Sequence, residues 1–159
     1  MVQDNKPVGK TFTDTIVFHK AVGHKVKYTT PYNDSYKGDG PLGMVNTIRG
    51  SKNFHDGQWQ AWLVKDMEIV IDLEKELSIE KVAVGTLESQ GAGIYFPIQV
   101  TVLVSKDGTN YKEAGKILRP FAVNVNSELK DFKINFEKQE VRFVKVIATN
   151  LKKRPTNNV

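Results

Sequence analysis

Residues 67–73 read Met-Glu-Ile-Val-Ile-Asp-Leu, and this stretch decides the fold class of the chain. Large apolar residues recur at every second position, with acidic residues between them, which is the pattern of a half-buried β-strand. Residues 98–104 (Ile-Gln-Val-Thr-Val-Leu-Val) and 132–136 (Phe-Lys-Ile-Asn-Phe) repeat the alternation. Three such segments along one chain predict a protein built of β-strands.

Turn residues and β-branched segments extend this pattern in both directions. Residues 79–87 and 141–149 are rich in β-branched residues, and the second segment slips phase at residues 143–144, which indicates a β-bulge. Residues 105–108 read Ser-Lys-Asp-Gly, a strong hairpin-turn signal, and residues 74–77 connect two predicted strands. No window has the periodicity and caps of a long helix. The sequence therefore predicts an all-β fold, an antiparallel β-sandwich.

The composition fits a single globular domain. The chain has 159 residues, of which 26% are charged and 40% hydrophobic, and this balance is unlike that of a disordered protein. The absence of cysteine excludes disulfide scaffolds, cysteine nucleophiles and zinc ribbons. No apolar run reaches the ~20 residues of a membrane helix. The formal net charge of +5 is modest and its basic residues are scattered, so we expect no nucleic-acid partner.

The motifs of common enzyme classes are missing. Residues 38–43 fit the spacing G-x-G-x-x-G, but no strand precedes them, a proline interrupts them and no helix follows, so we expect no nucleotide site. His19, His24 and His55 lie in no zinc-binding spacing. The sequence pairs no carboxylates for a glycosidase and has no Gly-x-Ser-x-Gly motif. The chain is therefore predicted to be non-catalytic.

Two clusters hold the residue types that bind sugars. Residues 49–62 (Arg-Gly-Ser-Lys-Asn-Phe-His-Asp-Gly-Gln-Trp-Gln-Ala-Trp) combine amides, planar donors and two indoles. Residues 88–97 combine glycines with two aromatic rings. A flat ring can support the apolar face of a sugar while polar groups bind its hydroxyls. The alternative is that these rings fill the core, and for the first cluster we expect Trp62 to be mostly buried and Trp59 nearer the surface.

The order of these segments resembles a known family, the discoidin-type or coagulation factor 5/8 type C domain, over roughly residues 18–151. The resemblance is greatest to the version at the C-terminus of bacterial β-N-acetylhexosaminidases (chitobiases), and many relatives are family 32 carbohydrate-binding modules. Its most specific part is the first cluster. The segments that carry it are residues 49–51, 53–57, 59–62, 68–73, 94–97, 100–102, 105–108, 111 and 141–146.

The resemblance implies a discoidin-like jelly roll of about eight strands, formed by one domain over residues 1–159 with a flexible start (1–15) and tail (152–159). It implies a glycan-binding accessory domain excised from a longer, exported bacterial glycoside hydrolase, found in the periplasm, at the cell surface or outside the cell. The parent enzyme would be a β-N-acetylhexosaminidase, and the domain would hold it near its substrate. We expect sugars of the N-acetylhexosamine or galactose type, a monomer and no membrane partner.

The resemblance also implies a set of binding residues. Trp59 would be the stacking platform, with Tyr95 as the alternative, and Arg49, Asn53, His55, Gln60 and Gln90 would bind sugar hydroxyls. Many relatives have an arginine at the position of Gln90, which indicates a ligand different from theirs. Relatives often hold a structural Ca²⁺, which takes oxygen ligands. Asp39, Asn46 and Asp56 are the candidate side chains, although Asn46 replaces the usual aspartate and the usual last strand is missing after Leu151.

Two other functions fit the same resemblance. The domain could bind phospholipid or protein through apolar loop residues, here Tyr95 and Phe96, together with lysines. It could also be a structural spacer that packs on the catalytic domain and binds no ligand.

Overall fold

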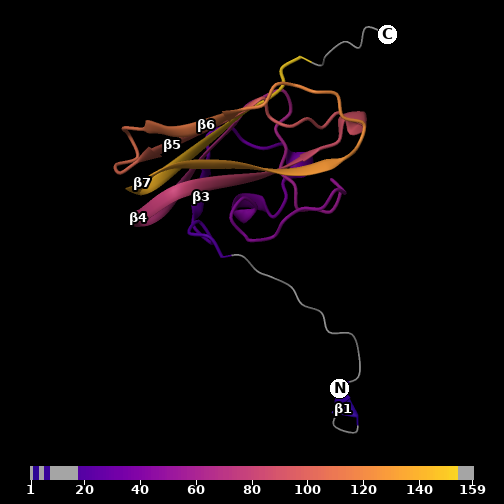
Figure 1. Cartoon of the computed structure of the whole chain (residues 1–159), viewed down its shortest axis with the longest axis horizontal. Coiled ribbons are helices and arrows are strands. Elements are labelled where there is room, and N and C mark those ends of the chain that lie inside the picture. The colour runs from indigo at the N-terminus through magenta and orange to yellow at the C-terminus, as the bar shows by residue number, and fades with distance from the viewer. Residues whose placement is uncertain (1, 4–5, 8–17, 154–159) are drawn as a thin grey trace.

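The computed structural model of the chain describes residues 2–3, 6–7 and 18–153 and consists mainly of antiparallel β-strands and loops (Figure 1). In this part of the chain five strands form one sheet in the order β3-β4-β7-β5-β6, and β1 pairs with β2 separately. Most of the predicted start (1–15) and much of the predicted tail (152–159) lie outside the described residues. The elements are β1 (Val2–Gln3), β2 (Lys6–Pro7), β3 (Lys25–Tyr28), η1 (Asp34–Tyr36), η2 (Gly40–Leu42), β4 (Met67–Glu88), η3 (Gln90–Ala92), β5 (Gln99–Ser105), β6 (Lys112–Leu118) and β7 (Glu128–Thr149).

The two central strands are longer than the alternation predicted. Residues 67–73 and 79–87, expected as separate strands, are the two halves of β4. Residues 132–136 and 141–149 are likewise the two halves of β7. The two strands pair with each other through both halves, so the chain makes two strands of 22 residues where four shorter ones were expected.

A register shift replaces the expected connection at residues 74–77. The pairing of β4 with β7 breaks between Asp72 and Leu77 and then resumes. Glu74 adopts a left-handed backbone with φ 65°, and its N–H donates to the Asp72 carboxylate at 2.7 Å. A bulge of this kind bends a strand without ending its ladder, and alternation alone does not reveal it.

Both long strands bend back at their register shifts, so their halves lie in two layers (Figure 1). One layer holds β3, β5 and β6 with the adjoining halves of β4 and β7, and the other holds the remaining halves. A Cβ added to Gly115 of β6 would lie 2.8 Å from Ile134 of β7, so these layers touch face to face. The predicted antiparallel β-sandwich is confirmed.

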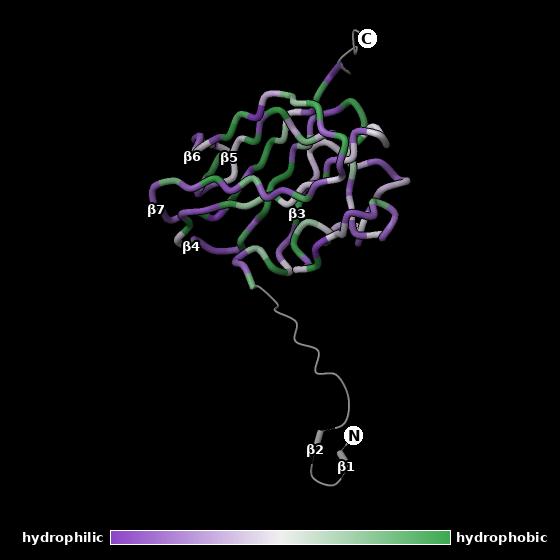
Figure 2. The backbone as a smooth tube through the Cα atoms, turned by 45° about the vertical axis from the view of Figure 1, so that its right-hand side comes forward, coloured by the Kyte–Doolittle hydropathy of each residue, from purple (hydrophilic) through white to green (hydrophobic). Residues whose placement is uncertain are grey.

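The core lies between the layers and follows the alternation of the sequence. Val100, Val102 and Val104 of β5 point inward and are at most 4% exposed. The rings of Phe96 and Phe132 meet edge to face at 6.1 Å. Figure 2 shows apolar residues along the strands and hydrophilic residues over most of the loops. Burial of these strand faces fixes the frame on which the loops are held.

The long loops gather at the end of the sandwich opposite the β5–β6 turn (Figure 1). They comprise residues 29–66, 89–98 and 119–127. The first loop closes on itself, because Asn33 donates to the Ala61 carbonyl at 2.9 Å and Ala61 donates to that of Tyr36 at 3.2 Å. A loop with this many internal bonds can hold side chains in fixed positions.

Candidate functional site

The first loop encloses an open hollow of about 250 Å³, which we call the loop hollow. One wall comes from η1 and the residues after it, and the other comes from the sequence cluster around Trp59. Four of its side chains are rings, which is the composition of a saccharide platform. The lining residues are Ser35, Tyr36, Lys37, Gly38, Phe54, His55, Gly57 and Trp59.

Trp59 is held against the backbone by a glycine. A Cβ added to Gly50 would lie 2.3 Å from Cε2 of the indole, so only glycine permits this approach. The indole Nε1 donates to the Ser51 carbonyl at 2.8 Å. The Trp59 side chain is half-buried, and it lines the loop hollow with its orientation fixed.

The other rings lie beside one another in the same hollow. The His55 ring is 4.1 Å from the Phe54 ring and 6.5 Å from the Tyr36 ring, measured between centroids. His55 is exposed, so its imidazole can meet a ligand from solvent. Together these rings give apolar surface with a polar ring atom at its edge.

Short side-chain bonds to the backbone shape the segment around His55. Asn53 accepts from the His55 N–H at 3.1 Å, and the Asp56 carboxylate accepts from the N–H groups of Ser51 and Gln58. Burial alone would raise the pKa of Asp56, but these N–H donors outweigh it, so the pKa lies below its ordinary value. The ionised carboxylate therefore helps to fix this segment at neutral pH.

Gln60 and Trp62 tie the loop together and do not line the hollow. The Gln60 amide donates to the carbonyls of Lys37 at 3.1 Å and Gly40 at 2.8 Å, and its oxygen accepts from the Tyr28 hydroxyl at 3.0 Å. Trp62 packs on the core and donates to the Thr30 carbonyl at 2.9 Å. Trp62 thus contacts the core and Trp59 lines the hollow, but both residues are half-buried, so the expected difference in their burial is not seen.

Arg49 lies at the edge of the same loop. Its guanidinium pairs with the Asp131 carboxylate of β7 at 2.7 Å, and about half of its side chain is exposed (48%). The pair joins the loop to the sandwich. Exposed ion pairs contribute little to stability, so we assign this one a positioning role.

The second cluster forms its own set of contacts. Gln90 donates to the Ala122 carbonyl at 2.8 Å and accepts from the Asn124 N–H at 3.1 Å. The Tyr95 ring lies 6.1 Å from the Phe121 ring. Among the described residues, no hydrogen bond or ring contact joins Gln90 or Tyr95 to the loop hollow. Phe96 is only 2% exposed, so the expectation that it projects from a loop is wrong.

Sequence reasoning missed Tyr36 and gave Phe54 no role, although both line the loop hollow. The position of Phe54 next to His55 was a usable signal. Tyr36 had none, because the turn at residues 33–36 that brings it to the hollow depends on a bond from the Ser35 N–H to the Asn33 side chain.

The three candidate calcium ligands are engaged with the protein. The Asn46 amide donates to Asp39 at 3.2 Å, and its oxygen accepts from the Ile48 N–H at 3.0 Å. Both Asp56 oxygens accept backbone N–H groups. In the described residues no group of three or more His, Cys, Asp or Glu side chains is placed to hold a metal. Ca²⁺ takes six to eight oxygen ligands, which can include backbone carbonyls, and the calcium expectation rests on the resemblance alone.

Comparison with protein families shows where this fold belongs. The F5/8 type C domain family matches residues 25–158. The chain belongs to the F5/8 type C domain family. The family expected from the two sequence clusters is thereby confirmed. None of the curated proteins matches the chain.

Solved structures share the fold of this F5/8 type C domain at low identity. Chitosan-binding module 2 of a chitosanase/glucanase from Paenibacillus sp. IK-5, in complex with chitotriose, has a TM-score of 0.54 and 19% identity over 83% of this chain and 88% of that chain. A CBM32 module from Clostridium perfringens, in complex with GlcNAc-α-1,4-galactose, has a TM-score of 0.53 and 13% identity over 92% and 88%. Another, in complex with GalNAc-β-1,3-galactose, has a TM-score of 0.50 and 18% identity over 79% and 84%. The likeness shows a shared β-sandwich.

Proposed function

We propose that this F5/8 type C domain is a non-catalytic module that binds glycan in the loop hollow. The observation that carries the proposal is the fixed Trp59 indole, which lines a hollow with three further rings. A sugar presents an apolar C–H face and a rim of hydroxyls, and an aromatic surface with polar edges suits both. The solved modules with sugars bound have the same fold, which supports this assignment.

Trp59 is the proposed platform, with His55 as the hydrogen-bonding group beside it. Lys37 and Ser35 line the same hollow and supply further polar groups. Gln60 acts as a positioning residue, because its amide is bound to the loop backbone. Asn53 holds the His55 backbone, and Arg49 anchors the loop.

Gln90 and Tyr95 supply a separate edge of the proposed surface. Both lie in the second cluster, where Gln90 is bound to residues 122 and 124. A longer glycan that extends from the loop hollow is the ligand that would use them.

The proposed ligand carries N-acetylhexosamine or galactose-type sugars. Modules that share the fold bind chitotriose and galactose-containing disaccharides in their solved structures, which supports this class. An open site of this size gives a Kd on the order of 0.1–1 mM, or about −4 to −5.5 kcal/mol. Attachment to an exported glycoside hydrolase of the β-N-acetylhexosaminidase type makes such weak binding useful, because it raises the local substrate concentration.

The test is a titration of the domain with chitotriose and GalNAc-β-1,3-galactose, followed by tryptophan fluorescence and calorimetry. Trp59→Ala should weaken binding by at least about tenfold, which is about 1.4 kcal/mol. His55→Ala should weaken it less. Lys52→Ala is the matched control, because Lys52 is exposed in the same loop and does not line the hollow. Unchanged affinity in a folded Trp59→Ala variant would refute the assignment.

A second function is favoured by exposed apolar residues at the end of β6 and in the loop that follows it. Leu118, Val123 and Val125 are 67%, 72% and 92% exposed. Exposed apolar residues suit insertion into a phospholipid surface. Sedimentation with phosphatidylserine vesicles separates the two functions. Binding that is lost in Val123→Ser with Val125→Ser would support the lipid function, and no sedimentation would exclude it.

A further inference from the structure

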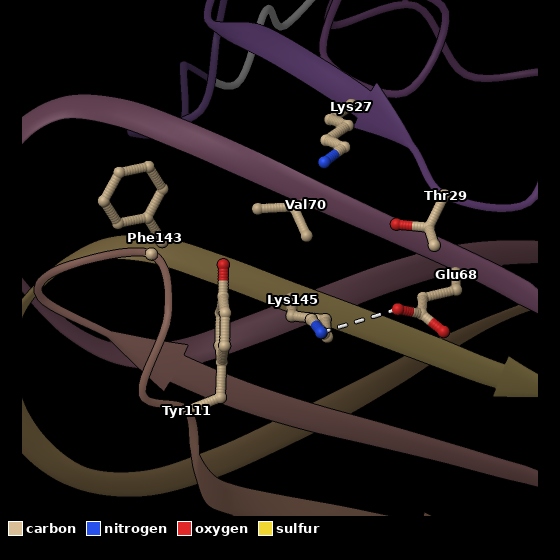
Figure 3. Close-up of a pocket in the computed structure, with 8 residues that line it drawn as sticks. Lys27, Thr29, Glu68, Val70, Tyr111, Phe143 and Lys145 are labelled. Atoms are coloured by element: carbon tan, nitrogen blue, oxygen red, sulfur yellow. Dashed lines mark ion pairs between the residues drawn. The ribbon is translucent and has the colours of Figure 1, made fainter.

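A second hollow crosses the outer face of the sheet and shares no residue with the loop hollow. It is a groove of about 350 Å³ over β3, β4 and β7, and the β5–β6 turn closes one side (Figure 3). We call it the sheet groove. It is lined by Lys27, Thr29, Glu68, Val70, Gly108, Tyr111, Phe143 and Lys145.

The strand register assembles this groove. Lys27 of β3 pairs with Val70 of β4, and Val70 pairs with Lys145 of β7, so the three side chains lie on one rung. The lining residues alternate with buried ones such as Ile69 and Val144, whose side chains fill the core. The groove therefore lies on the face of the sheet that the second layer leaves uncovered.

Aromatic side chains form its walls. In Figure 3 Tyr111 stands between Phe143 and Lys145, and the Lys145 ammonium lies 4.4 Å from the centre of its ring. A Cβ added to Gly108 would lie 3.1 Å from the Phe143 ring, so the turn packs closely on this ring. Both rings are half-buried and held in place by neighbours on one side.

Polar groups of both kinds converge on the groove. Lys145 pairs with Glu68 at 3.5 Å. Within the described part of the chain, the Lys27 ammonium and the hydroxyls of Thr29 and Tyr111 have no hydrogen-bond or ion-pair partner, and all three face the groove (Figure 3). Burial and the nearby Asp107 and Asp72 carboxylates raise the pKa of Tyr111, so its hydroxyl stays protonated at neutral pH.

We propose that the sheet groove is a second saccharide site, which takes a neutral sugar unit of an oligosaccharide. Sugar hydroxyls both donate and accept, and the groove offers a donor (Lys27), an acceptor (Glu68) and two hydroxyls that do both. Glu68 and Lys145 neutralise each other as an ion pair, which leaves the Lys27 ammonium to donate to a sugar oxygen, and the rings of Tyr111 and Phe143 suit the apolar face of a pyranose. This site goes beyond the loop hollow, and two sites on one domain strengthen binding to a long glycan by avidity.

The test is residue-resolved NMR of the ¹⁵N-labelled domain titrated with chitotriose, GalNAc-β-1,3-galactose, cellotriose and galactotriose at millimolar concentration. At least one sugar should shift the amide signals of residues 27, 70, 111 and 143. These shifts should persist in Trp59→Ala, which removes the platform of the loop hollow. The affinity read from these shifts should fall by at least about tenfold in Tyr111→Ala. It should be unchanged in Lys112→Ala, which replaces the exposed neighbour of Tyr111.

Thr29→Val provides a second variant that keeps the side-chain shape and removes one hydroxyl, and it should weaken the same shifts even if Tyr111→Ala fails to fold. The proposal is overturned if none of the four sugars shifts these signals. It is also overturned if the shifts are unchanged in Tyr111→Ala. If the Tyr111→Ala variant does not fold, unchanged shifts in Thr29→Val overturn the proposal instead. Sugar binding in the loop hollow is measured separately, from the amide signals of residues 55, 57 and 59, so its absence would not be mistaken for absence of binding in the sheet groove.

Discussion

The two hollows of this domain are built in opposite ways. The loop hollow comes from residues 35–38 and 54–59, which side-chain bonds to nearby backbone hold in place. The sheet groove comes from four separated segments, whose side chains meet only because β3, β4 and β7 pair in one register. A site built within a loop depends on that loop, whereas a site built on a sheet face depends on the whole frame.

Removal of a core ring should damage both hollows at once, which is the largest effect we expect. Phe132 is 1% exposed and packs on Phe96 between the layers. Phe132→Ala should lower the free energy of unfolding by about 3–5 kcal/mol, since it leaves a cavity in the core. Urea unfolding followed by circular dichroism measures this loss.

Phe18→Ala is the control for that prediction, because Phe18 is 78% exposed, and it should change stability by less than ~0.5 kcal/mol. If Phe132→Ala unfolds at the same urea concentration as the parent, the proposed common frame is wrong.

A change at Gly50 should damage the loop hollow alone. The added methyl of Gly50→Ala would overlap the Trp59 indole and displace it, at a cost of about 1–3 kcal/mol. Tryptophan fluorescence should shift and sugar binding in the loop hollow should be lost, while signals from residues 70 and 143 stay in place. Gly91→Ala is the matched control, because a Cβ there meets nothing within 4 Å. A parent-like fluorescence spectrum in Gly50→Ala would contradict the close packing.

Acid should act on both regions, with a smaller effect. Bonds from Arg142 lower the pKa of Asp72 in the sheet, and in the loop the N–H donors to Asp56 outweigh burial and lower its pKa. A carboxyl whose pKa is depressed by folding stabilises the protein above its unfolded pKa, and this contribution is lost as the pH falls through the folded value. The melting temperature should therefore decrease as the pH is lowered below about 4.

Asp56→Asn separates the two regions in that experiment. The substitution should reduce, but not abolish, the fall of the melting temperature at acid pH, because Asp72 still titrates. An acid profile identical to that of the parent would show that Asp56 contributes nothing to loop stability.

The sequence revealed most of the frame and part of the site. Alternation located one half of each long strand and β-branched content located the other, and the cluster around His55 and Trp59 contained one wall of the loop hollow. It did not reveal that the halves are continuous, because the bulge at Glu74 resembles a turn in sequence. The role of Gln60 was also hidden, since an amide that binds Lys37 and Gly40 looks the same in sequence as one that binds a ligand.

The sheet groove was out of reach for a different reason. Lys27, Tyr111 and Lys145 are far apart along the chain and carry no motif. Only the pairing of the strands brings them together, and alternation predicts which face a residue takes but not its neighbour across the sheet.

The two bent strands also determine how the domain is expected to unfold. β4 and β7 each contribute to both layers, and the loops 89–98 and 119–127 also run from one layer to the other, so four segments of the chain join the two layers. We expect neither half of the sandwich to melt while the other persists, because the two layers share one core and the loss of either would expose the apolar face of the other. We therefore expect a single cooperative thermal transition, in which a ligand bound to one layer also protects the other.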